Sequence, residues 1–133
     1  MMHHKLKCDG PKFRATLLGQ TPYEIRFNDR NYQVGDRITL RETLHTGEEM
    51  KEGRNGLPGK PLIYTGWEQD RTVTHVLDTY GLQKGWAILT TEAVLPIAES
   101  VRFVPGADLD AKLGAMLGGF FKDISDILRG KKL

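Results

Sequence analysis

The spacing of apolar residues changes along the first third of the chain. Residues 4–8 are typical of a short first strand, and the residues after them carry apolar side chains at helical spacing. Asp9 suits the N-cap of such a helix, and Gly19 suits the position just after its end. The sequence therefore predicts a strand followed by a helix of two to three turns.

From residue 23 the apolar residues recur at every second position. Apolar side chains alternate with polar ones through residues 23–28, which is the pattern of a half-buried strand. One face of this strand would carry the apolar residues Tyr23, Ile25 and Phe27. The opposite face would then carry three polar residues: Glu24, Arg26 and Asn28.

Further strands are predicted in the middle of the chain. Residues 38–44 alternate, but Glu42 falls on their apolar face, where a buried carboxylate needs a partner. Residues 86–89 are nearly all apolar, which predicts a central strand buried on both faces. The glycine-rich residues 47–61 are typical of a long surface loop. The strands expected from these patterns are 38–44, 62–65, 72–77 and 86–95.

The end of the chain has a different pattern. From Asp108 onward, apolar residues recur every three or four positions, which predicts an amphipathic helix of roughly five turns. Its apolar face would pack on the rest of the chain or on a second copy, forming a homodimer. We therefore expect a domain over residues 1–104 and a helical extension over residues 105–133.

Composition narrows the class of protein. The chain has 133 residues, of which 39% are hydrophobic and 27% charged, as expected for one globular domain. No apolar run approaches the roughly 20 residues that cross a bilayer. Cys8 is the only cysteine, so neither an intrachain disulfide nor a cysteine-based zinc site is expected. We expect a cytoplasmic protein without membrane contact, metal or cofactor; the spacing of the histidines does not indicate a metal site either.

Four short motifs carry a resemblance to a known family. They are His4–Lys7, Gly19–Arg26, Asn28–Arg30 and Val34–Asp36. In this order they resemble the ASCH domains of the PUA-like superfamily, and most closely a small branch found in phages and bacteria. The resemblance covers about residues 2–94. It implies an α+β fold, a small PUA-like β-barrel with a short helix after its first strand, to which the amphipathic C-terminal helix is added.

The resemblance also implies a function. ASCH domains are associated with binding RNA or a nucleobase, in a cleft between the first helix and the barrel. One branch hydrolyses an acetylated cytidine, and takes its lysine and threonine from a G-x-K-x-x-T stretch. Here Thr21 stands at the lysine position and Glu24 at the threonine position, so this sequence departs from the hydrolytic pattern.

Several residues are candidates for contacting such a ligand. A carboxylate such as Glu24 can accept from the amine or ring N–H of a base, and a guanidinium such as Arg26 can clamp phosphate or carbonyl oxygens. In the alternative, Glu24 forms an internal ion pair with Arg26 or Arg41 that only fixes the strand register. The binding candidates are His4, Lys7, Glu24, Arg26, Asn28, Arg30, Glu42 and Trp67.

Three functions follow from these observations. The first is a binding module for RNA, single-stranded nucleic acid or a modified nucleotide. The second is a nucleobase amidohydrolase or ribonuclease-like enzyme, in which Glu24 is the general base, Thr21 the nucleophile, and Arg26 or Lys7 stabilises developing negative charge. The third is a protein-interaction adaptor that uses the C-terminal helix.

Overall fold

One strongly curved sheet forms the frame of the structure. The computed structural model describes residues 1–51, 53 and 56–105. The helix expected after Asp108, and the homodimer built on it, lie outside the described residues. The strands are β1 (His3–Asp9), β2 (Tyr23–Phe27), β3 (Arg37–Thr43), β4 (Tyr64–Leu77), β5 (Trp86–Ala93) and β6 (Val101–Phe103), and the helices are α1 (Gly10–Leu17), α2 (Gly47–Met50) and α3 (Ile97–Ser100).

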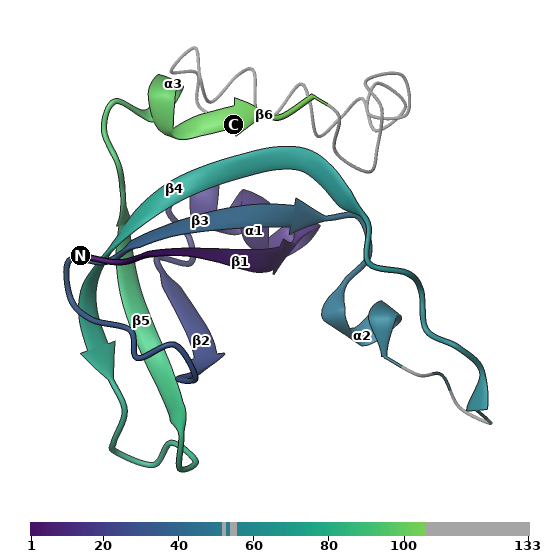
Figure 1. Ribbon diagram of the computed structural model, residues 1–133, viewed down its shortest axis with the longest axis horizontal. Helices are drawn as coiled ribbons and strands as arrows, with labels where there is room; N and C mark the ends of the chain where they lie inside the picture. Colours follow the sequence, from purple (N-terminus) through teal and green to yellow (C-terminus); the bar gives the residue numbers. More distant parts are fainter. Residues whose placement is uncertain (52, 54–55, 106–133) are drawn as a thin grey trace.

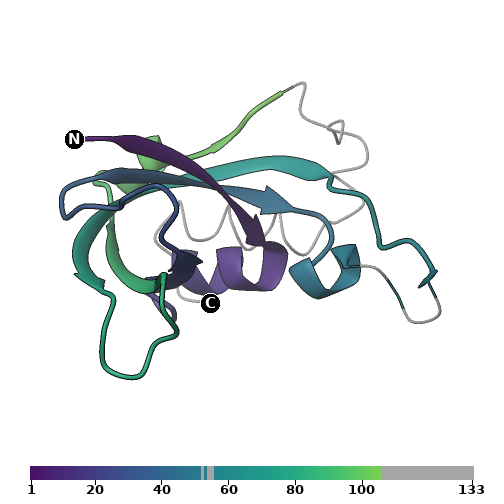
Figure 2. The same cartoon turned by 60° about the horizontal axis from the view of Figure 1, so that its bottom comes forward.

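The strand order is β1-β3-β4-β5-β2, with β6 beside the first part of β4. Among the strands that the structure describes, only β1 and β3 pair in parallel; the other pairs are antiparallel. The sheet curls into a half-barrel, so that β2 and β5 run across the direction of β1, β3 and β4 (Figure 1). Helix α1 packs on β1 and β3, and the single turn α2 lies next to α1, beyond the end of β3 (Figure 2). The expected α+β class and barrel-like sheet are therefore present.

Side chains, rather than main-chain pairing, join the two end strands of the half-barrel. Arg26 on β2 donates from Nη2 to the carbonyl oxygen of Lys7 on β1. Arg30, just after β2, donates from Nη1 to the carbonyl oxygen of Lys5 over 2.9 Å. We call this junction between β1 and β2 the seam.

Strand β4 is one element of 14 residues, where the sequence pattern indicated two shorter strands. Gly66 does not interrupt it. The φ angle of Gly66 is +103°, and a Cβ atom there would lie 2.6 Å from the ring of Phe103. The glycine thus lets β6 pack closely on β4 while the strand continues.

The core lies on the concave side of the sheet, beneath α1. Phe13 of α1 is fully buried, and Gln69 of β4 donates from Nε2 to its carbonyl oxygen over 2.9 Å. Other buried apolar side chains come mainly from β1, β3, β4 and β5: Leu6, Cys8, Ile38, Leu40, Val73, Ala87 and Leu89. No helix among the described residues is long and apolar enough to span a membrane.

Strand β2 is half-buried, but its polar side faces the core. Glu24 is only 3% exposed, whereas Ile25 and Phe27 are 54% and 53% exposed. The register explains this, since Glu24 pairs with the fully buried Leu89 of β5. The expectation that residues 86–89 are buried on both faces is also wrong, because Trp86 is exposed. An apolar strip therefore remains on the outside of β2 and β5.

Candidate functional site

A pocket of about 330 Å³ opens where α1, α2, the end of β1 and the inner side of β2 meet. This is the region between the first helix and the barrel that was expected to hold a ligand. We call it the Glu24 pocket. Its lining residues are Lys7, Cys8, Asp9, Lys12, Tyr23, Glu24, Ile25, Arg26, Gly47 and Met50.

The Glu24 carboxylate lies between two cations. Lys12 Nζ is 2.7 Å from its Oε2 atom, and Arg26 Nη2 is 2.8 Å from its Oε1 atom. Behind it, Arg71 of β4 is buried and donates to Thr91. Burial lowers the pKa of Arg71, and the negative charge of Glu24 partly offsets this effect. The carboxylate thus has a cation on each side.

Lys12 links α1 to the start of β2. Its ammonium group donates to the carbonyl oxygen of Tyr23 over 2.6 Å and to Thr21 Oγ1 over 3.2 Å. It also donates to Thr16 Oγ1, one helical turn away, over 3.1 Å. The sequence analysis did not select Lys12. Its spacing of four from Thr16 on a helix was the signal that could have indicated a shared face.

Asp9 fixes α2 at the rim of the pocket. It precedes α1, but its side chain does not cap that helix, contrary to the sequence prediction. Instead Oδ1 of Asp9 accepts from the backbone N–H of Gly47 over 2.9 Å. Thr46 and Glu49 form a capping box at the start of α2. One turn of helix within the expected 47–61 loop therefore brings Met50 to the pocket.

Cys8 and Glu42 lie next to each other on paired strands, with Cys8 in the pocket wall. Burial raises the pKa of the Cys8 thiol, and the charge of Glu24 raises it further. Burial also raises the pKa of Glu42 to about 7, although Thr65 Oγ1 donates to it over 2.6 Å and the charge of Arg14 favours ionisation. The pocket wall thus places an unreactive thiol beside a carboxyl that titrates near neutrality.

A model of the family described as "Domain of unknown function (DUF3850)" matches residues 3–91, well over half of the chain. The chain belongs to the DUF3850 family. The match extends from β1 into β5 and includes every residue that lines the Glu24 pocket. A comparison with curated proteins found no match.

In this DUF3850 domain, three of the eight candidate binding residues line the pocket: Lys7, Glu24 and Arg26. The Glu24–Arg26 ion pair considered from the sequence is present. Arg41, the other partner considered for Glu24, has its ion pair with Glu68 instead. Of the catalytic candidates, Thr21 contacts Lys12 but is not among the residues that line the pocket.

Five candidates lie elsewhere in the domain, and three of them hold the fold together. His4 is buried, and its Nε2 atom lies 2.9 Å from Oδ2 of Asp36. Asn28 accepts from the backbone N–H of Tyr32 over 3.0 Å, as expected of a turn residue. Arg30 joins the seam, as described above. Glu42 is buried near the pocket without lining it.

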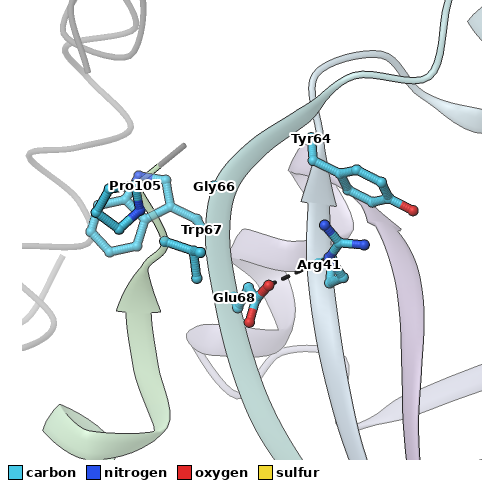
Figure 3. Close-up of a pocket in the computed structure, with 7 residues that line it drawn as sticks. Arg41, Tyr64, Gly66, Trp67, Glu68 and Pro105 are labelled. Atoms are coloured by element: carbon cyan, nitrogen blue, oxygen red, sulfur yellow. Dashed lines mark ion pairs between the residues drawn. The ribbon is translucent and has the colours of Figure 1, made fainter. Parts of the chain in front are cut away.

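Trp67 lines a second, smaller pocket that shares no residue with the Glu24 pocket. This pocket has a volume of about 160 Å³ and lies between β3, β4 and the segment after β6 (Figure 3). The rings of Trp67 and Phe103 are 5.6 Å apart. Arg41 stacks over Tyr64 at 3.7 Å and lies 3.4 Å from Glu68. Trp67 therefore does not provide a stacking surface for the Glu24 pocket.

Among the residues that the structure describes, no group of three or more histidine, cysteine, aspartate or glutamate side chains could hold a metal ion. The chemistry that the Glu24 pocket offers is hydrogen bonding and charge, supplied by two carboxylates, Asp9 and Glu24, and three cations, Lys7, Lys12 and Arg26.

Proposed function

We propose that this DUF3850 domain binds a nucleobase or nucleotide, free or within RNA or single-stranded DNA, in the Glu24 pocket. One observation carries the proposal: a buried carboxylate, held between two cations, forms the wall of an open pocket. The volume of about 330 Å³ falls at the lower end of the range for small-molecule sites. The resemblance to ASCH domains of the PUA-like superfamily supports the same ligand class.

The pocket offers complementary groups for the edge of a base. The oxygens of Glu24 can accept from an exocyclic amine or a ring N–H, while Arg26 can donate to a carbonyl oxygen. A ligand amine that bonds to Glu24 would replace one of its two cations. The displaced Lys12 or Arg26 would then be available to a ligand phosphate, so charge stays balanced on binding.

The same contacts favour binding over hydrolysis. Thr21 was the nucleophile candidate, but the Lys12 ammonium donates a hydrogen bond to its hydroxyl. A protonated amine that donates to a hydroxyl cannot also remove the hydroxyl proton. Because Lys12 is paired with Glu24, neither group is available as a general base in this arrangement.

Titration calorimetry with a panel of nucleosides, nucleotides and 12-residue RNA and DNA strands tests the proposal. We expect at least one of these ligands to bind, and Glu24→Gln to weaken that binding at least tenfold, because it removes a charged acceptor. The matched control is Glu48→Gln on α2, whose carboxylate is exposed and pairs with Lys51. Measurements are made where circular dichroism shows all three proteins folded.

Two results would contradict the proposal. The first is that no member of the panel binds. The second is that Glu24→Gln binds the ligand as tightly as the unchanged chain, which would make the Glu24 cluster part of the scaffold only.

A further inference from the structure

The outer side of β2 and β5 carries an exposed apolar surface. We call it the aromatic face: Tyr23, Ile25, Phe27 and Trp86, all of which are exposed. Phe27 pairs with Trp86 across the two strands, and their rings are 5.9 Å apart. An apolar patch with polar surroundings is typical of an interaction site. Three of its four members are aromatic rings, which can stack on flat ligands.

Cations follow the seam beside the aromatic face. Arg26 and Arg30 cross it, and the side chains of Lys5 and Lys7 are exposed on the adjoining strand. Within the described part of the chain, neither lysine has an ion pair. We call these four residues the seam cations. Glu24 is turned inward, which leaves Asp29 as the exposed acid of the stretch from Tyr23 to Tyr32.

The aromatic face and the seam cations meet at the Glu24 pocket. Tyr23 and Ile25 belong both to the aromatic face and to the pocket lining. Lys7 and Arg26 likewise belong both to the seam cations and to the pocket lining. A ligand with one group in the pocket would therefore continue over flat apolar rings on one side and positive charges on the other.

We propose that a single-stranded nucleic acid lies along the seam, with phosphates on the seam cations and bases stacked on the aromatic face. This inference rests on the proposed function and specifies its ligand as a strand rather than a free nucleotide. Stacking platforms beside a basic track are the usual means of holding single strands. One unstacked base of the strand occupies the Glu24 pocket.

The spacing along β2 requires more than one nucleotide. Tyr23 and Phe27 are four residues apart, which is about 13 Å along a strand. One base cannot cover both rings, so a single nucleotide would leave Phe27 and Trp86 unused. The charges also favour a polyanion over a second copy of the chain, because a symmetric dimer through this face would bring two sets of seam cations together.

Fluorescence anisotropy with a labelled 12-residue single strand, compared with the matching mononucleotide at several salt concentrations, tests the inference. We expect the strand to bind at least tenfold more tightly than the mononucleotide, with an affinity that falls as salt rises. Phe27→Leu keeps an apolar side chain but removes the ring. It should weaken strand binding about tenfold and leave the mononucleotide affinity unchanged.

Two matched controls accompany this variant. Leu62→Ile changes an exposed apolar residue of the loop before β4, outside the aromatic face and the Glu24 pocket, and should leave strand binding unchanged. Lys5→Gln should reduce the dependence on salt by about one released counterion, whereas Lys60→Gln, an exposed lysine of the loop before β4, should not.

The possible failures are distinguishable. If the mononucleotide binds but the strand binds no more tightly and Phe27→Leu has no effect, this inference is overturned and the proposed function stands. If neither ligand binds, the proposed function fails, and the inference fails with it. If light scattering shows a dimer that Phe27→Glu dissociates, and no strand binds, a second copy covers the aromatic face and the inference is overturned.

Discussion

Glu24 and Glu42 are equally buried, each exposed to 3%, yet they have different partners. Glu24 lies within 2.8 Å of two cations, whereas Glu42 accepts one hydrogen bond from the Thr65 hydroxyl. Burial dominates at Glu42 and raises its pKa to about 7. The comparison teaches that two equally buried carboxyl groups of one fold can have different surroundings. Glu24 contacts two cations, whereas Glu42 contacts one hydroxyl.

The largest effect we predict is a pH dependence of stability that comes from Glu42. Below its ordinary pKa of 4.5 the carboxyl is protonated in both the folded and the unfolded chain. Between pH 4.5 and about 7 the unfolded chain ionises while the folded chain keeps its proton, so stability falls as pH rises. The expected loss is about 3 kcal/mol.

Urea denaturation at several pH values measures this loss. Glu42→Gln retains an acceptor for Thr65 but cannot ionise, so it should equal the unchanged chain near pH 4.5 and exceed its stability at pH 8. Glu48→Gln on the exposed side of α2 serves as the control. Parallel stability curves for the unchanged chain and Glu42→Gln would show that Glu42 ionises normally.

The same substitution at Glu24 should lower the free energy of unfolding, whereas Glu42→Gln should raise it at pH 8. Glu24→Gln removes the negative charge between Lys12 and Arg26 and is expected to lower the free energy of unfolding by about 2 kcal/mol at pH 7. Thermal unfolding followed by circular dichroism measures it. An unchanged free energy of unfolding would mean that water stabilises Lys12 and Arg26 as well as the Glu24 carboxylate does.

The smallest effect concerns the hydrogen bond that Glu42 accepts from the Thr65 hydroxyl. Thr65→Val removes this donor, so the pKa of Glu42 should rise further, and the pH-dependent loss, which still begins near pH 4.5, should extend above pH 7. The cost in stability at pH 5 should be about 1 kcal/mol. Thr43→Val is the matched control. This buried threonine donates to the carbonyl oxygen of His45, so removing its hydroxyl should not change the pH at which the loss of stability ends. If the loss of stability ends at the same pH in both variants, the Thr65 hydrogen bond does not influence the pKa of Glu42.

Local patterns predicted many of the elements but not the orientation of β2. Alternation in residues 23–28 correctly placed Glu24 and Arg26 on one face. It could not tell which face points inward, because that depends on the register with β5 and on Lys12 reaching over from α1.

Site residues were predictable where the chain holds them close together, and not where the partner is distant. Glu24 and Arg26, two positions apart on β2, do meet in one pocket. His4 was a reasonable ligand candidate on a first strand, but Asp36, which lies 32 residues later in the sequence, pairs with it in the core. No short-range pattern reveals such a contact. Lys12 was missed for the same reason, since its role depends on how α1 packs against β2.

The arginines of the seam have a consequence for self-association. The end strand of an open sheet offers unpaired carbonyl groups, on which a strand of another molecule can add. On β1, the carbonyls of Lys5 and Lys7 are already occupied by Arg30 and Arg26. A foreign strand would have to displace both guanidinium groups before it could pair there. The side chains that join the half-barrel therefore also guard its first strand against aggregation.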